Sequence, residues 1–234
     1  MDSEQRLKKP TSIIPFGQQS QLRVLVVTAV SAERDAVVRA LHRDPRFDVL
    51  VGGVGAVVAA VNTTKALVGA EYSLVISAGI GGGFPGRAEV GSLVVGTEIV
   101  AADLGAETSD GFNSLDELGF GMTRILTDAN LAKCITKALQ DAKLPVNTGP
   151  VLTVSTVTGT SETAIELAAR INDASAEAME GFGVGFAALD RGLPVLEIRA
   201  ISNIVGPRDR SAWRIKEALD VLEAACEVLT EVLV

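Results

Sequence analysis

Short runs of apolar and β-branched residues alternate along the chain with segments in which apolar residues recur at helical spacing. The first run, residues 22–28, does not alternate apolar with polar positions, which is typical of a strand buried on both faces of a sheet. Similar runs predict strands over residues 49–54, 74–78, 93–100, 150–155 and 195–201. Helical spacing predicts helices over residues 32–41, 56–68, 130–141, 163–169, 182–189 and 212–233.

Most of the predicted strands are separated by one predicted helix, and this order indicates the fold class. Such strand–helix–strand units are crossovers that join parallel strands. We therefore predict an α/β fold of three layers, with a mainly parallel central sheet flanked by helices. Residues 103–127 are rich in glycine and aspartate and predict a long excursion from the sheet, which is uncommon unless the segment has a function.

Length and composition fit one globular domain. The chain has 234 residues, of which 47% are hydrophobic and 21% charged, as is usual for globular proteins. We predict a single domain over residues 21–234, preceded by a loose polar extension at residues 1–20. That extension lacks the apolar segment of a signal peptide, and no apolar run reaches the length of a membrane span. We therefore expect no membrane partner.

Charge and cysteine content narrow the partners and the compartment. The formal net charge is −8, whereas binding to nucleic acid depends on clustered lysine and arginine. We therefore expect a small-molecule ligand and no nucleic acid. Cys134 and Cys226 are the only cysteines and do not form a disulfide framework, so we expect a reduced, cytoplasmic protein.

A glycine-rich segment, residues 79–86 (GIGGGFPG), follows one predicted strand. It does not complete the GxGxxG pattern of dinucleotide-binding loops, because Phe84 occupies the third glycine position counted from Gly79, and Pro85 precedes Gly86 when the count begins at Gly81. Two interpretations remain. The glycines either form tight turns or let the backbone approach a ligand at the carboxyl ends of parallel strands. We expect no cofactor.

The residues available for catalysis are carboxylates and amides. The only histidine, His42, lies at a polar predicted helix end, and no cysteine–histidine cluster or HExxH motif offers metal ligands. Glu33, Glu180 and Asn203 each follow a predicted strand and would share one edge of a parallel sheet. Each also has a structural interpretation: the glutamates as acids in the first turn of a helix, and Asn203 as a turn residue.

Five motifs, in order, resemble the nucleoside phosphorylase and nucleosidase superfamily, and in particular its 5′-methylthioadenosine/S-adenosylhomocysteine nucleosidases. They span the chain from about Leu22 to its C-terminus. They are residues 29–33 (AVSAE), 77–83 (SAGIGGG), 90–95 (VGSLVV), 178–180 (AME) and 199–203 (RAISN). The resemblance implies the nucleoside phosphorylase fold, with a mixed, mainly parallel sheet, for a single nucleosidase domain.

The resemblance also implies roles for individual residues. Glu33 would be the base that activates water, and Met179 and Glu180 would hold the ribose hydroxyls. This is chemically coherent, because cleavage of an N-glycosidic bond passes through a cationic sugar that needs a positioned water and a nearby carboxylate. Further substrate contacts are implied for Ala29, Ile80, Gly81, Gly82 and Ser202.

The chain departs from the adenine-specific nucleosidases at Asn203, where they carry aspartate. An amide can donate from its NH₂ group to purine O6 and accept from N7–H, which suits hypoxanthine or guanine. Mismatched buried polar groups cost about 1–3 kcal/mol each, so we expect adenine nucleosides to be poor substrates. The alternative is that Asn203 replaces aspartate passively and the enzyme remains an adenine nucleosidase.

Residues 199–213 most resemble the futalosine hydrolases, which release hypoxanthine and dehypoxanthinyl futalosine during menaquinone biosynthesis. A purine nucleoside phosphorylase is the alternative, but residues 71–76 lack the arginine that hexameric phosphorylases carry there. We hypothesise that Trp213 stacks on the carboxyphenyl tail of futalosine and that Arg208 or Arg210 pairs with its carboxylate. The opposing interpretation is a solvated basic loop with Trp213 in the core.

Two further points follow from the resemblance. It implies a homo-oligomer, with Phe112 or Phe120 of a neighbouring copy closing the site. A nucleoside-binding protein without activity is a competing class, since fold does not determine function. The presence of both Glu33 and Glu180 argues against it.

Overall fold

The computed structural model describes residues 22–109 and 111–233, so the predicted extension at residues 1–20 lies outside the described residues. The strands are β1 (Val24–Thr28), β2 (Phe47–Val51), β3 (Leu74–Gly83), β4 (Leu93–Ala101), β5 (Gly105–Thr108), β6 (Gly111–Ser114), β7 (Arg124–Leu126), β8 (Val146–Thr153), β9 (Ala176–Ala178) and β10 (Val195–Ile204). The helices are α1 (Ser31–Ala40), α2 (Ala56–Gly69), α3 (Ala129–Asp141), α4 (Ser161–Arg170), α5 (Gly181–Asp190) and α6 (Ile215–Val232), with a short 3₁₀ turn, η1 (Arg210–Ala212).

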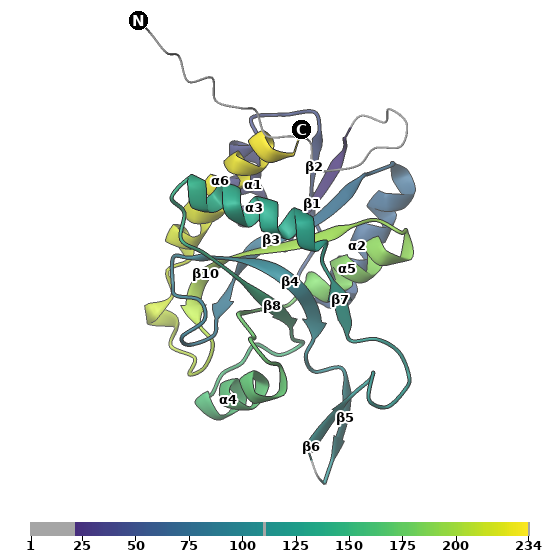
Figure 1. The fold of residues 1–234 in the computed structure, drawn as a ribbon, viewed down its shortest axis with the longest axis vertical. Coiled ribbons are helices and arrows are strands. Elements are labelled where there is room, and N and C mark those ends of the chain that lie inside the picture. Colours follow the sequence, from purple (N-terminus) through teal and green to yellow (C-terminus); the bar gives the residue numbers. More distant parts are fainter. Residues whose placement is uncertain (1–21, 110, 234) are drawn as a thin grey trace, which may run out of the picture.

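The main sheet runs in the order β10, β4, β8, β9, β3, β1, β2, with β7 added beside β4 (Figure 1). Strand β10 also pairs with β3, so β3, β10, β4, β8 and β9 close into a ring. Most neighbours are parallel, whereas the pairs β4–β10, β3–β9 and β4–β7 are antiparallel. The predicted mixed, mainly parallel sheet is confirmed.

Helices cover both faces of this sheet. Helices α1, α3 and α6 pack on one face around buried residues such as Val37, Ile135 and Leu222. Helices α2 and α5 lie side by side on the other face (Figure 1), where Ala59 and Val184 pack against β1 and β3. The three predicted layers are therefore present, and the sheet is buried from both sides, as its unbroken apolar runs require.

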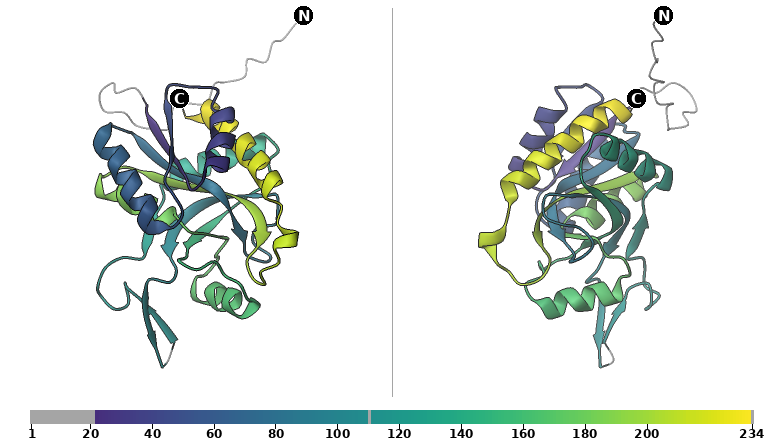
Figure 2. Two further views of the ribbon diagram at one scale, coloured as in Figure 1. Left: turned by 180° about the vertical axis from the view of Figure 1, so that it is seen from behind. Right: turned by 60° about the vertical axis from the view of Figure 1, so that its left-hand side comes forward.

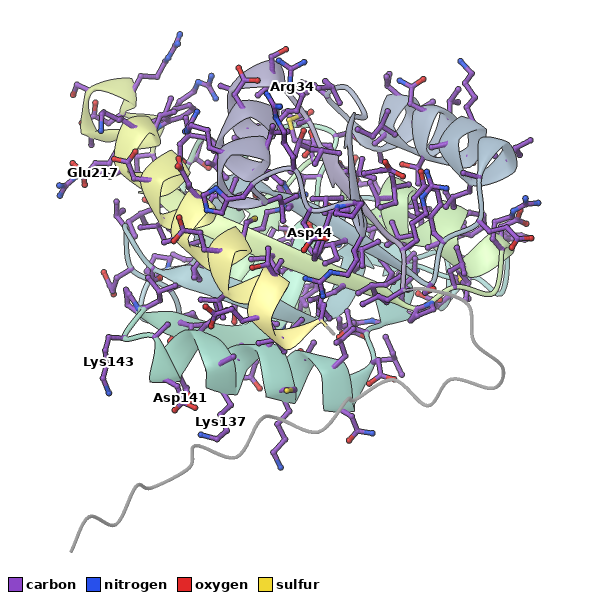
Figure 3. The ribbon with its side chains drawn as sticks, turned by 90° about the horizontal axis from the view of Figure 1, so that it is seen from above. Arg34, Asp44, Lys137, Asp141, Lys143 and Glu217 are labelled. Carbon is purple, nitrogen blue, oxygen red and sulfur yellow. The ribbon has the colours of Figure 1, made fainter. Side chains whose placement is uncertain are left out.

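Helix α3 illustrates how one helix divides its two faces. Leu131, Ile135 and Leu139 are buried toward the sheet. On the opposite face Lys137 and Asp141 point away from the protein (Figure 3) and form an ion pair of 2.9 Å. Both side chains are exposed, so the pair contributes little to stability, and the apolar face holds the helix in place.

Three predicted strands end elsewhere than the sequence pattern indicates. Strand β2 ends at Val51, before the glycines at positions 53 and 55, which have positive φ. Strand β3 continues through Gly83, and β10 continues through Ile204, so Asn203 is a strand residue and not a turn residue. The predicted excursion over residues 103–127 is present, and its described residues include a hairpin of β5 and β6 (Figure 2) followed by β7.

Across residues 22–109 and 111–233, no helix combines the length and apolar character needed to cross a bilayer.

Candidate active site

A cavity of about 340 Å³ opens where β1, β3 and β10 end and α5 begins. Ligands of open parallel sheets bind at such carboxyl edges. All of the predicted site residues line this cavity except Arg208 and Arg210, which lie outside it. Those lining it are Ala29, Glu33, Ile80, Gly81, Gly82, Met179, Glu180, Ser202, Asn203 and Trp213.

Glu33 is held by backbone groups from two separate elements. It is 3% exposed, and its Oε2 accepts from the N–H groups of Ala29 and Val30, at 2.8 and 3.2 Å. Its Oε1 accepts from the N–H of Ile80 on β3, at 2.9 Å. The structural interpretation is therefore partly correct, because Glu33 caps its own helix. The bond to Ile80 also fixes the carboxylate at the wall of the cavity.

Most of the glycine-rich segment is part of strand β3, which continues through Gly83. Its glycines at positions 79 and 81–83 do not have positive φ. A Cβ atom on Gly79 would lie 2.5 Å from Glu33 Oε1 and 2.7 Å from Arg199 Nη1, both closer than carbon can approach. The tight-turn interpretation is therefore wrong for the glycines of β3 and correct for Gly86, which lies in a turn and has positive φ. Glycine is required along this part of β3 because other groups occupy the space that a side chain would need. These groups are the side chains of Glu33 and Arg199 at Gly79 and backbone carbonyls at Gly81 and Gly83.

An ionic cluster lies beneath the cavity and centres on Arg199, which is 1% exposed. Its Nε donates to Glu197 at 2.8 Å, its Nη2 donates to Ser77 Oγ at 2.9 Å, and its Nη1 lies 3.6 Å from Glu180. Burial acts to lower the pKa of the guanidinium, but Glu197, Glu180 and Glu33 outweigh this and hold that pKa above its ordinary value. Arg199 thus keeps these carboxylates together in a buried site.

Glu180 is positioned by the same cluster and by the turn before α2. Its Oε1 accepts from the N–H of Gly55 at 3.1 Å, and its Oε2 accepts from Met179 N–H at 3.4 Å. The side chain makes no capping hydrogen bond to α5, although Glu180 is the N-cap residue. The helix-acid interpretation therefore does not account for its position at the cavity.

Asn203 reaches the cavity through an irregularity in β10. The pairing of β10 with β3 shifts between Ile201 and Asn203, which places Asn203 opposite Gly82. Such bulges re-aim side chains next to active sites. The Ser202 hydroxyl donates to Asn203 Oδ1 at 2.8 Å, and Asn203 Nδ2 donates to the Ile204 carbonyl at 3.1 Å. The amide is therefore oriented by its two neighbours.

Glu177 is a third buried carboxylate at the cavity, beside Glu33 and Glu180, and it received no role from the sequence. It lies on β9, and its Oε1 accepts from Thr158 N–H at 2.9 Å, while the Thr158 hydroxyl donates to Oε2. Burial raises the pKa of Glu177, and the bonds from Thr158 oppose that effect. The available signal for Glu177 was its position two residues before Met179. Strand β9 has only three residues, so no hydrophobic period in the sequence identifies it as a strand.

The segment after β10 places an aromatic ring at the cavity and two arginines outside it. Trp213 is half-buried and lines the cavity, so the interpretation that it belongs to the core is wrong. The guanidinium carbons of Arg208 and Arg210 lie 5.2 and 5.9 Å from the centre of its ring. Both arginines are exposed, so their charged ends remain available to a ligand.

Comparison of the sequence with known proteins identifies the family of this chain. The family model of the phosphorylase superfamily matches residues 8–234. The futalosine hydrolase of Streptomyces coelicolor is 51% identical over 91% of this chain and 97% of its own length. The chain belongs to the futalosine hydrolase family of the phosphorylase superfamily. The predicted resemblance is confirmed.

Solved structures agree on the fold. The 5′-methylthioadenosine/S-adenosylhomocysteine nucleosidase of Helicobacter pylori aligns with a TM-score of 0.80 at 16% identity, covering 91% of this chain and 99% of that one. The futalosine hydrolase of the same organism aligns with a TM-score of 0.79 at 16% identity, covering 89% and 97%. At this identity the likeness extends to the fold alone, and the substrate must be argued from the site.

Proposed function

We propose that the protein hydrolyses the N-glycosidic bond of futalosine, releasing hypoxanthine and dehypoxanthinyl futalosine, as a step of menaquinone biosynthesis. The proposal is supported by its family membership and by one observation in particular. Glu33, with a carboxylate held by three backbone N–H groups, lines the same cavity as Asn203. One residue suits water activation, and the other suits a 6-oxopurine.

In this proposal Glu33 accepts a proton from water while the water oxygen bonds to C1′ of the ribose. The bond from C1′ to the purine nitrogen breaks, and the sugar passes through a cationic state. The negative Glu33 carboxylate stabilises that state, since a fixed charge needs no reorganisation during the reaction. Glu180 accepts hydrogen bonds from the ribose hydroxyls beside Met179, and Gly55 and Arg199 hold it in place.

Asn203 binds the leaving base. The purine takes up a proton at N7 from a solvent water as the bond breaks, and the proton that Glu33 took from the attacking water is then released to neutralise the hydroxide left behind. Asn203 Oδ1 accepts from that N7–H while Nδ2 donates to O6. Ser202 supports this orientation because its hydroxyl donates to Oδ1. A phosphorylase would instead need cationic side chains to bind phosphate. Among the described residues, no lysine or arginine lines the cavity.

The function is tested by following hypoxanthine release from futalosine and inosine, with and without phosphate, alongside 5′-methylthioadenosine and S-adenosylhomocysteine. We expect release from futalosine that does not depend on phosphate, and little adenine release. A requirement for phosphate would identify a phosphorylase. Preference for the adenine nucleosides would identify an adenine nucleosidase, and no release from any substrate would favour a binding protein.

The tail of futalosine gives a prediction for Arg208 and Arg210. We propose that Trp213 packs on the aromatic ring of the tail and that these arginines pair with its carboxylate. The double variant Arg208→Ala/Arg210→Ala should raise the KM for futalosine roughly fivefold, since an exposed ion pair is worth up to about 1 kcal/mol. Inosine has no such tail and serves as the control. An unchanged KM for futalosine would refute the pairing.

We also propose that two copies of the chain associate through an α2–α5 face, formed by Val57, Val61 and Val68 of α2 and Phe186 and Leu189 of α5. These residues are exposed, with Val57 at 78%, and a contiguous exposed apolar surface usually marks an interface. The face continues into the cavity through Val54, which is exposed and lines it.

Of the two predicted closing residues, Phe120 fits this dimer better. Phe112 already packs against Arg170 of its own chain, at 4.0 Å, whereas Phe120 is 80% exposed. We expect sedimentation to give a dimer, and Val57→Glu/Val61→Glu to give a monomer. Ile165→Glu, an exposed apolar residue on α4, is the matched control. A wild-type monomer, or a dimer that survives the double change, would contradict the interface.

The proposal places the enzyme in the cytoplasm. Cys134 and Cys226 are both free thiols, which suits a reducing compartment.

A further inference from the structure

Glu177 and Asn203 flank Gly82 from opposite sides in one row across three strands. Gly82 of β3 pairs with Glu177 of β9, and Asn203 of β10 pairs with Gly82. Paired residues on adjacent strands project to the same face of a sheet. Neighbouring strands lie about 4.8 Å apart, and Glu177 and Asn203 lie on strands that are separated only by β3.

The middle position of this row is a glycine because its neighbours leave no room for a side chain. A Cβ atom on Gly82 would lie 2.9 Å from Val205 and 3.3 Å from Asn203 Nδ2. All three residues of the row line the cavity. The row therefore places an amide and a carboxylate on the wall of one cavity, where both can contact the edge of a flat ring.

Glu177 has hydrogen-bonding capacity beyond its contacts within the protein. It is 5% exposed, and Thr158 supplies one N–H and one hydroxyl donor. An ionised carboxylate offers about four acceptor sites, and buried polar groups are normally satisfied. The remaining acceptor sites are available to a donor within the cavity.

We infer that Glu177 accepts a hydrogen bond from N1–H of the purine, while Asn203 binds the O6 and N7 end of the same edge. This rests on the proposed function, which makes the base a 6-oxopurine. Such a base has a hydrogen on N1, whereas adenine has a lone pair there. A carboxylate only accepts, so Glu177 favours the 6-oxopurine and repels adenine.

Glu177 contacts an atom of the base that Asn203 does not. Ser202 and the Ile204 carbonyl orient the Asn203 amide, which binds O6 and N7 and leaves N1 to Glu177. An ionised carboxylate only accepts hydrogen bonds. Thr158 donates to both oxygens of Glu177, which opposes the rise in the pKa of this carboxyl that burial causes. Specificity for the base is therefore assigned to the pair Glu177 and Asn203.

The test is titration calorimetry of hypoxanthine and adenine into the wild type, Glu177→Gln and Glu231→Gln. Glu231 is exposed on α6 and provides the matched control. We expect Glu177→Gln to lower the preference for hypoxanthine over adenine at least tenfold, about 1.4 kcal/mol, because a glutamine can donate from its NH₂ group to adenine N1 whereas an ionised carboxylate only accepts. An unchanged preference, or equal losses for both bases, would overturn the inference.

Thr158→Val is the second variant, since it removes a donor that orients Glu177 without changing the charge of the site. It should reduce the preference for hypoxanthine in the same direction but by less. An unchanged preference in this variant counts against the inference even if Glu177→Gln fails to fold. Failure of the wild type to bind either base would contradict the proposed function, whereas binding that ignores position 177 would contradict this inference alone.

Discussion

Glu33→Gln is expected to lower futalosine turnover by about 100- to 10,000-fold, the usual range for loss of a positioned acid–base group. The amide cannot take a proton from water. It also has only one acceptor oxygen, whereas Glu33 satisfies N–H donors with both of its oxygens, those of Ala29 and Val30 at one and that of Ile80 at the other. In Glu33→Gln, either the N–H groups of Ala29 and Val30 or the N–H of Ile80 therefore face an NH₂ group and lose their acceptor.

The measurement is hypoxanthine release followed by ultraviolet absorbance, together with a thermal melt. We expect the melting temperature to fall as well, because an unsatisfied buried donor costs about 1–3 kcal/mol. Asp35→Asn on the same helix is the matched control, since Asp35 is exposed and pairs with Arg34. A folded Glu33→Gln enzyme that retains turnover within tenfold of the wild type would remove Glu33 from its proposed role.

Asn203→Asp should lower 6-oxopurine turnover at least tenfold and raise the turnover of adenine nucleosides. Aspartate removes the NH₂ group that donates to O6 and places negative charge beside that oxygen. The loss of a matched hydrogen bond costs about 1–3 kcal/mol, and 1.4 kcal/mol is a factor of ten. The aspartate oxygens can instead accept from the 6-amino group of adenine.

The experiment compares kcat/KM for inosine, futalosine and 5′-methylthioadenosine. Asn130→Asp, an exposed change on α3, controls for the added charge. If Glu177 also disfavours adenine, Asn203→Asp alone should gain only part of the adenine activity, and Asn203→Asp/Glu177→Gln should gain more. Unchanged substrate preference in Asn203→Asp would show that this amide does not select the base.

The candidate site was predictable from the sequence only where it coincided with continuous motifs. Glu33, Met179 and Asn203 each lie within a short continuous motif, so their sequence neighbours made them recognisable. All three residues line one cavity. Glu177 and Arg199 received no role because their partners are distant in the chain. Thr158, which bonds to Glu177, lies 19 residues away in another element, and Ser77, which bonds to Arg199, lies 122 residues away.

The hydrophobic pattern determined the secondary structure and the fold class. Buried strands and amphipathic helices are dictated by local spacing, so residues 22–28 and 93–100 predict β1 and β4 with only small errors at the ends. The residue types that could act, two glutamates and an asparagine without a catalytic histidine or metal motif, were likewise fixed by the sequence. Local spacing does not specify which strands pair.

The tertiary structure alone decided how these residues meet. The pairing of β10 with β3 closes the ring, and the shift in register beside Ser202 turns Asn203 to face Gly82. The glycines of β3 belong to a strand and not to a loop, because Glu33 and Arg199 occupy the space that a side chain at Gly79 would need. Such contacts join segments far apart in sequence, and the packing of the folded chain determines them.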